Sequence, residues 1–146
     1  MKKLITLISI CVAACSATAA SINDKNFGSL KVSRVDSIYD GDTFRVTIDQ
    51  VNPIIGERIP IRVAGIDTPE IRGKCKKEKK LAQQAKQFTV SAIRKSQNIE
   101  LHNVKRGKYF RIIADVKLNG YDLGHALIEK GFAVPYDGGK KIDWCQ

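Results

Sequence analysis

The sequence predicts an α+β fold that is mainly β: a small five-stranded Greek-key barrel carrying two or three helices. Several short stretches alternate apolar and polar residues between Gly, Asn, Asp or Pro, which is typical of β-strands. One longer stretch, 78–95, instead repeats its apolar residues at helical spacing. The 146 residues are enough for one hydrophobic core, so a single domain is expected.

The first two strands are expected on either side of an acidic turn. Residues 30–39 alternate imperfectly and lead into Asp40-Gly41, a dipeptide typical of tight turns. The next stretch alternates cleanly, with three apolar side chains on one face: Phe44, Val46 and Ile48. Asp42 shares the parity of that face, where a carboxylate is costly unless a partner offsets its charge.

The third strand, 59–66, poses a problem of direction. Its apolar residues recur at every second position, and Asp67 continues that parity, whereas Arg62 has the opposite one. A regular strand would therefore point Arg62 and Asp67 apart. Glycine inside a strand often marks a bulge or a bend, so we expect Gly65 to re-aim the chain between Val63 and Asp67.

The remaining elements complete the barrel. Apolar residues of the predicted helix recur at i+3 and i+4: Leu81, Ala85, Phe88 and Ala92. Two more strands are expected, at 99–106 and 109–118, followed by a short helix that begins after Asp122 and stops at Gly131. Three strands, a helix, two strands and a helix fit a barrel of the OB type.

Charged residues collect at the ends of the second and third strands. Asp42 follows the acidic turn, Asp67 and Glu70 follow the third strand, and Arg62 lies within it. Carboxylates gathered at one end of a small core repel each other unless a cation or an arginine offsets them. Taken alone, Thr68-Pro69-Glu70 would simply begin a short helix. The whole set instead favours a site for a divalent cation beside an arginine that binds an anion.

The net charge favours a polyanionic partner. The chain has 25 Lys and Arg against 15 Asp and Glu, and removal of Lys2 and Lys3 with the leader lowers the formal charge from +10 to +8. Such an excess on a small domain attracts nucleic acid, although simple solubility explains it equally well. A basic stretch at 72–80 lies beside the predicted site and fits either a solvated face or steering of a phosphate backbone.

The first twenty residues are typical of an export signal. Lys2 and Lys3 precede an apolar run, 4–14, and a small-residue cleavage region, 17–20. A lipoprotein box ending at Cys15 is an alternative reading of the same stretch. Two cysteines remain in the mature chain, Cys75 and Cys145, and in an exported protein a disulfide between them is favoured over two free thiols.

Several fragments occur in a diagnostic order over residues 32–136. They are DGDT at 40–43, Arg62, DTPE at 67–70, Lys108-Tyr109-Phe110-Arg111, and Ala126-Leu127 ahead of Gly131-Phe132-Ala133. Together they resemble the staphylococcal nuclease (thermonuclease) family. With the leader expected at 1–20, the resemblance implies a nuclease domain at 28–146.

The resemblance implies three groups of site residues. Calcium would be held by two carboxylates and one main-chain carbonyl: Asp42, Asp67 and Thr68. The catalytic groups would be two arginines on the scissile phosphate and a glutamate that orients the attacking water: Arg62, Arg111 and Glu70. Substrate contacts would come from Lys108, Tyr109 and Tyr136. Phe110 stands where the best-known member of the family has glycine beside its second arginine.

The implied activity is that of a calcium-dependent, sugar-nonspecific endonuclease that cuts DNA and RNA and leaves 3′-phosphate ends. The expected protein is exported, periplasmic or secreted, monomeric, and free of stable membrane insertion unless Cys15 carries a lipid. The alternative is a non-catalytic OB-type module that binds nucleic acid. Such a module has no need of three inward carboxylates, which would repel phosphate without a metal.

The two export readings predict different mature proteins. Mass spectrometry of the exported chain should find an N-terminus at or just after the small residues 17–20. A chain that begins with a lipid-modified Cys15 would contradict this reading and establish the lipoprotein alternative.

Overall fold

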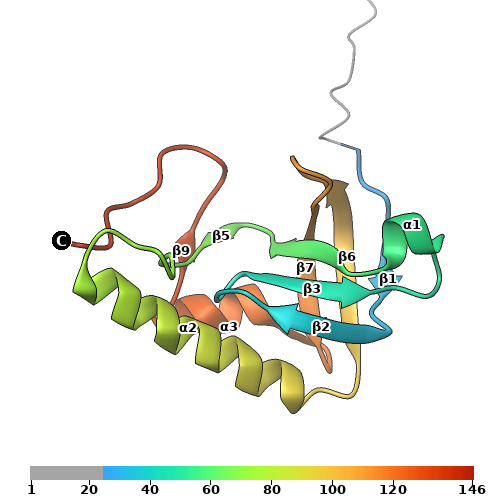
Figure 1. Cartoon of the computed structure of the whole chain (residues 1–146), viewed down its shortest axis with the longest axis horizontal. Helices are drawn as coiled ribbons and strands as arrows, with labels where there is room; N and C mark the ends of the chain where they lie inside the picture. Colours follow the sequence, from blue (N-terminus) through green and yellow to red (C-terminus); the bar gives the residue numbers. More distant parts are fainter. Residues whose placement is uncertain (1–24) are drawn as a thin grey trace, which may run out of the picture.

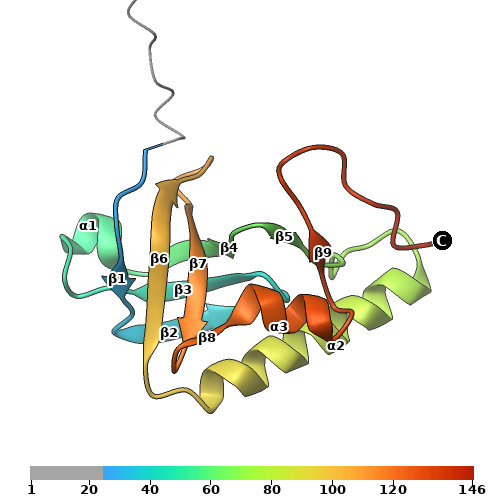
Figure 2. The ribbon, with the colours of Figure 1, turned by 180° about the vertical axis from the view of Figure 1, so that it is seen from behind.

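The computed structural model describes residues 25–146, so the predicted leader and Cys15 lie outside the described residues. The order of elements along the chain is β1 (Leu30–Lys31), β2 (Arg34–Ile38), β3 (Thr43–Thr47), α1 (Pro53–Gly56), β4 (Ile59–Val63), β5 (Ile66–Asp67), α2 (Lys76–Arg94), β6 (Ile99–Arg106), β7 (Ile112–Leu118), β8 (Tyr121–Asp122), α3 (Leu123–Glu129) and β9 (Val134–Pro135). The two longer helices lie side by side along one edge of the sheet (Figures 1 and 2).

The main sheet has the order β1-β6-β7-β4-β3-β2, with β8 beside β7, and β5 pairs separately with β9. Only β4 and β7 pair in parallel in the main sheet of the described chain. The five strands of five or more residues, β2, β3, β4, β6 and β7, are the five that the sequence predicts. The fold is therefore mainly β and of the OB type, as expected.

The sheet curls because its two ends are joined by a very short connection. Strands β1 and β2 are consecutive in the chain but lie at opposite ends of the strand order. Between them, the Val32 N–H donates to the Ile99 carbonyl at 2.9 Å and the Ser33 N–H to the Thr47 carbonyl at 3.0 Å. Residues 32–33 thus bridge the two ends, which brings the sheet close to a closed barrel.

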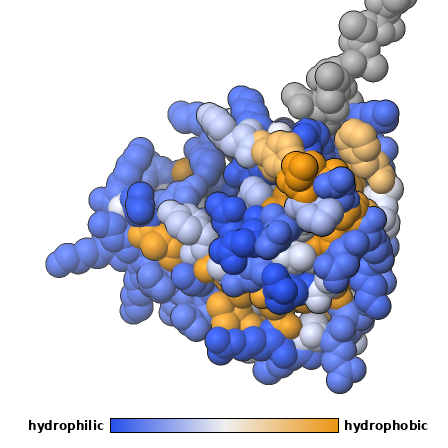
Figure 3. Space-filling model, turned by 45° about the vertical axis from the view of Figure 1, so that its right-hand side comes forward, coloured by the Kyte–Doolittle hydropathy of each residue, from blue (hydrophilic) through white to orange (hydrophobic). Residues whose placement is uncertain are grey.

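The core is made by the alternating residues that the sequence assigns to the inner face. Phe44, Ile61 and Leu101 are fully enclosed within the barrel, and Leu123 and Leu127 cover it from α3. The face of the molecule in Figure 3 is mostly hydrophilic, and its largest group of hydrophobic residues lies near the grey atoms. No helix among residues 25–146 is both long enough and apolar enough to cross a bilayer.

Two expected boundaries differ in the structure. Strand β7 begins at Ile112 instead of Tyr109, because Tyr109 and Phe110 adopt left-handed φ angles of 57° and 60° in a turn closed by the Gly107 N–H on the Arg111 carbonyl. No helix begins at Thr68. Helix α2 begins at Lys76, where the Cys75 sulfur caps the Glu78 N–H.

Helix α2 is packed directly against the acidic turn. The Thr89 hydroxyl, which is fully buried, donates to the Gly41 carbonyl at 2.7 Å. A Cβ atom at Gly41 would lie 2.9 Å from the Ala85 Cβ, so the helix and the turn are already in close contact. The turn that carries Asp42 is therefore held in place from behind by α2.

Removal of the Thr89 hydroxyl should loosen that contact. Thr89→Val keeps the shape but leaves the Gly41 carbonyl without its buried donor, so we expect a loss of about 1–2 kcal/mol in the free energy of unfolding. Ser91→Ala, on the exposed side of the same helix, should change it by less than about 0.5 kcal/mol. Equal urea midpoints for the two variants would contradict this role.

Candidate active site

Strand register places Arg62 beside Asp42. In the pairing of β3 with β4, Thr43 lies opposite Arg62, and the Val63 N–H donates to the Asp42 carbonyl at 2.9 Å. The turn before β3 is closed by the Tyr39 N–H on the Thr43 carbonyl at 2.9 Å. Two segments twenty residues apart thus meet at one end of the barrel.

The expected bend brings Asp67 to the same place. Gly65 has a φ of +71°, and after it β5 leaves the main sheet and pairs with β9, with Asp67 opposite Val134. The Tyr136 N–H donates to the Gly65 carbonyl at 2.8 Å and fixes the bend. The predicted irregularity between Val63 and Asp67 is confirmed.

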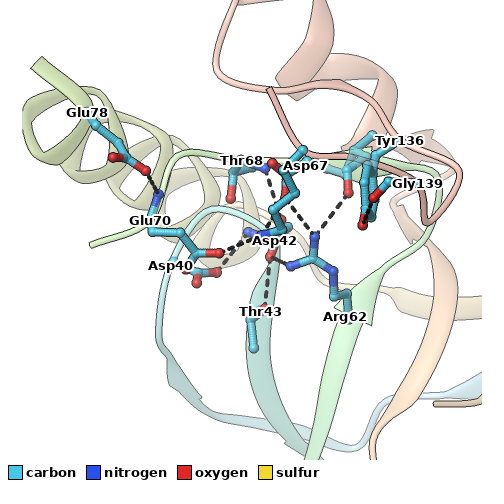
Figure 4. A network of polar contacts seen from close by, with 12 residues as sticks. Asp40, Asp42, Thr43, Arg62, Asp67, Thr68, Glu70, Glu78, Tyr136 and Gly139 are labelled. Carbon is cyan, nitrogen blue, oxygen red and sulfur yellow. Dashed lines mark hydrogen bonds and ion pairs between the residues drawn. The ribbon is translucent and has the colours of Figure 1, made fainter. Parts of the chain in front are cut away.

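One guanidinium joins the two buried carboxylates. Arg62 Nη1 lies 2.6 Å from Asp42 Oδ1, and Arg62 Nη2 lies 3.1 Å from Asp67 Oδ1 and 3.2 Å from the Ile66 carbonyl (Figure 4). Asp42 and Asp67 are each 1% exposed. Asp42 also accepts from the Thr68 N–H at 3.1 Å and from the Thr43 hydroxyl at 2.8 Å.

Glu70 lies at the open side of this group and is paired with a lysine that the sequence reasoning missed. Lys141 Nζ is 2.7 Å from Glu70 Oε1 and 2.9 Å from Asp67 Oδ1. Burial opposes the charged form of Lys141, but the hydrogen bonds to Glu70 and Asp67 outweigh it and raise its pKa. No pattern in the sequence points to Lys141, which lies 71 residues from Glu70.

Asp40 is a second residue that sequence reasoning did not assign to the site. Its side chain is 4% exposed, and its Oδ1 accepts from the Asp42 N–H at 3.2 Å. Burial, and then repulsion from Asp42, raise the pKa of Asp40 to about 7. The signal available in the sequence is the first carboxylate of DGD at 40–42, which is also typical of a tight turn.

A cavity of about 320 Å³ opens between these groups. Its walls include Asp40, Arg62, Glu70, Arg111, Tyr136 and Lys141. Arg111 is close enough to Arg62 to share the cavity, and its buried Nε has no hydrogen-bond partner among residues 25–146. The Tyr136 hydroxyl donates to the Gly139 carbonyl at 2.9 Å.

Two predicted substrate contacts lie apart from this cavity. Lys108 and Tyr109 are on the exposed loop between β6 and β7, and Tyr109 is 92% exposed. In the described part of the chain, neither residue lines the cavity. The same loop carries Phe110, whose ring stacks under the Arg106 guanidinium at 4.1 Å and therefore lies toward β6.

The donor set at Asp42 and Asp67 suits a hard divalent cation, since such ions take carboxylate and carbonyl oxygens. Repulsion from Asp42 is, after burial, the second cause of the raised pKa of Asp40, so the carboxylates at this place act on one another. Within residues 25–146, the three-residue group whose ligand atoms lie within 4.8 Å of one another is instead Cys75, Glu78 and Cys145. Its two sulfurs are bonded to each other, which excludes them as thiolate ligands.

The Cys75–Cys145 disulfide is present, with the two Cα atoms 6.0 Å apart. It ties the C-terminal segment to the N-terminus of α2, close to Glu70. A contact between Lys77 Nζ and the Gln146 carbonyl oxygen lies beside it.

Comparison with known proteins identifies the family. A family model described as staphylococcal nuclease homologue matches residues 60–143, which is more than half of the chain. The chain belongs to the staphylococcal nuclease homologue family. The matched region contains Arg62, Asp67, Glu70 and Arg111, whereas the DGDT stretch precedes it.

Two relatives illustrate the similarity. A probable endonuclease of Verticillium alfalfae is 29% identical over 149 residues, covering 88% of this chain and 52% of its own length. A probable endonuclease of Schizosaccharomyces pombe is 33% identical over 89 residues, covering 56% of this chain and 38% of its own length. The chain thus spans about half the length, or less, of these relatives.

Asp40 should make the stability of the metal-free protein depend on pH. Its pKa is about 7 in the folded chain and near the ordinary value of 3.8 when unfolded. The folded state therefore retains a proton that the unfolded state releases, so stability falls as the pH rises from about 4 to about 7.

Asp40→Asn removes this contribution. With chelator present, the free energy of unfolding of Asp40→Asn relative to wild type should rise between about pH 4 and about pH 7 in urea titrations. The exposed Asp49→Asn variant should follow the wild-type profile. Parallel profiles for all three proteins would contradict the burial argument.

Proposed function

We propose that the protein is a calcium-dependent nuclease that hydrolyses phosphodiester bonds of DNA and RNA. The observation that carries the proposal is the cavity in which Arg62, Arg111 and Glu70 meet beside two buried carboxylates. Membership of the nuclease family and the names of its relatives support the same activity.

The metal would be bound by the carboxylates of Asp42 and Asp67 and the main-chain carbonyl of Thr68. When bound, a calcium ion would supply positive charge to a phosphate oxygen and leave coordination positions open for water. The family is generally metal-dependent, and the choice of calcium rests on resemblance. Asp40 lies in the cavity wall beside Asp42, and a cation bound at this place would favour its charged form.

Arg62 and Arg111 would bind the scissile phosphate. A guanidinium offers paired N–H donors that match phosphate oxygens, and donors fixed in a partly buried site stabilise the charge that gathers on the phosphorane-like transition state. Arg62 is held by two carboxylates and lines the cavity, so its position is set before the substrate arrives.

Glu70 would orient the attacking water and accept its proton. Its side chain is 46% exposed at the cavity, unlike the enclosed Asp42 and Asp67, so water can reach it. The water oxygen forms the new bond to phosphorus as the P–O5′ bond breaks, and the leaving 5′ oxygen takes up a proton. The products are a 3′-phosphate end and a 5′-hydroxyl end.

Sequence and sugar discrimination should be weak. Contacts to the substrate would come from phosphate-binding groups, with Lys108, Tyr109 and Tyr136 as further contacts, and such groups carry no base information. The positive net charge would add affinity for any polynucleotide, in a salt-dependent way.

The proposal includes export to the periplasm or the medium as a monomer. Export is supported by the leader pattern at 1–20 and by the disulfide, which suits an oxidising compartment.

Digestion of plasmid DNA and RNA tests the proposed activity. Cleavage should require calcium, stop with chelator, and fall about 10²- to 10⁴-fold in Glu70→Gln, because the group that takes the proton is lost. Glu129→Gln, on the exposed end of α3, is the matched control and should cut like wild type. Cleavage that persists in chelator or in Glu70→Gln would contradict this mechanism. Tight binding without cleavage under any metal would instead establish the non-catalytic module.

A further inference from the structure

The last ten residues form a strap over the active site. The C-terminal strap, residues 137–146, leaves β9, arches away from the sheet and returns to the start of α2 (Figure 1). It is fastened at its far end by the Cys75–Cys145 disulfide. The strap therefore has fixed points on both sides of Lys141.

Among the described residues of the strap, Lys141 is the one whose side chain contacts Asp67 and Glu70. Its ammonium lies 2.7 Å from Glu70 Oε1 and 2.9 Å from Asp67 Oδ1, and its side chain is 44% exposed. An ammonium has three N–H donors, and these two contacts use two of them. The side chain also lines the cavity that holds Arg62 and Arg111, so its remaining donor has access to the same space.

A second cavity continues on the other side of Lys141. It has a volume of about 490 Å³, and Glu70 and Lys141 belong to the walls of both cavities. Lys74 and Lys140 line this second space, and so does Trp144, whose buried indole N–H lacks a partner within the described chain. The lysines of this space are offset by Asp67, Glu78 and Asp143 in the same wall, so a phosphate is favoured on the side of Lys141 that faces Arg62 and Arg111.

We propose that Lys141 is a substrate-binding residue that contacts a phosphate oxygen of the bound polynucleotide next to Glu70. The inference rests on the proposed nuclease function. Two arginines already supply positive charge on one side of the cavity, and Lys141 supplies it on the side of Glu70. The strap thereby completes the phosphate-binding wall with a residue from the C-terminal end.

The disulfide holds Lys141 near the cavity. Three residues lie between Lys141 and Cys145, so with the bridge closed the Lys141 backbone stays within four Cα steps, roughly 14 Å, of a fixed point. Without the bridge, β9 would be the only covalent attachment of the strap to the described fold, and ordering a long lysine side chain at the site would cost additional conformational entropy. We infer that the bridge raises the effective concentration of the ammonium at the site.

The direct test measures the binding of a single-stranded oligonucleotide by fluorescence anisotropy. Calcium is present, and every protein carries Glu70→Gln so that the oligonucleotide is not cleaved. Glutamine keeps an acceptor oxygen for Lys141. Lys141→Met should weaken binding about five- to tenfold, because a charge-assisted contact is lost. It should also lower the slope of log K against log salt by about 0.7, the value for one phosphate contact on a single strand.

Lys140→Met is the matched control. It removes the same charge from the adjacent residue, which lines the second cavity but, within residues 25–146, not the one with the arginines. Its effect on binding should be less than about twofold. Lys141→Arg, which keeps a charged donor, should recover most of the affinity.

A double-mutant cycle tests the role of the bridge. Replacing both Cys75 and Cys145 by serine should weaken binding to about the level of Lys141→Met, and adding Lys141→Met to that protein should have little further effect. In steady-state cleavage by the otherwise unaltered protein, Lys141→Met should raise KM more than it lowers kcat.

The outcomes separate this inference from the proposed function. If the unaltered chain cuts nucleic acid and Lys141→Met binds it like Lys140→Met, Lys141 has only an internal ion-pairing role and the inference is wrong. Tighter oligonucleotide or calcium binding in Lys141→Met would show a lysine that blocks the site, which also overturns it. If the unaltered chain does not cleave with any metal, the proposed function fails, whatever the binding data show.

Discussion

The structure depends above all on one guanidinium between two buried carboxylates. Asp42 and Asp67 are almost completely withdrawn from water, and two such charges would repel each other strongly without Arg62 between them. A buried charge network of this kind costs more in desolvation than a hydrophobic core of equal size. The protein retains it at the mouth of the barrel, and the proposed chemistry gives a reason for it: the same oxygens can hold a cation and the same guanidinium can bind phosphate.

The rest of the fold keeps this network in place from several sides. The register of β3 on β4 sets Arg62 beside Asp42, and the bend at Gly65 turns Asp67 toward both. Helix α2 supports the acidic turn through Thr89, while β9 pairs with the segment that carries Asp67. Arg62 and Asp67 thus lie on strands, which hold side chains more tightly than loops do, and the turn that carries Asp42 is fixed against them.

The electrostatics of the site are only partly balanced within the chain. Arg62 and Lys141 offset Asp42, Asp67 and Glu70, whereas burial, and then repulsion from Asp42, raise the pKa of Asp40. A place that favours a further cation and is walled by arginines suits the binding of a metal together with an anion. The proposed substrate is a polyanion, so one of its phosphates would be the anion that binds beside the metal.

The sequence by itself determined the strands, the inner face and most of the site. Alternation at 44–48 and 59–63 is a local property of the chain, so it identified the core and the opposite parity of Arg62 and Asp67. Gly65 indicated the bend that brings these two residues together. Only the tertiary structure decided that Lys141 reaches Glu70, that Asp40 is buried, and that Tyr109 and Phe110 form a turn instead of extending β7. These depend on the packing of segments far apart in the chain and on a disulfide that closes the strap, and no periodicity within a single segment encodes them.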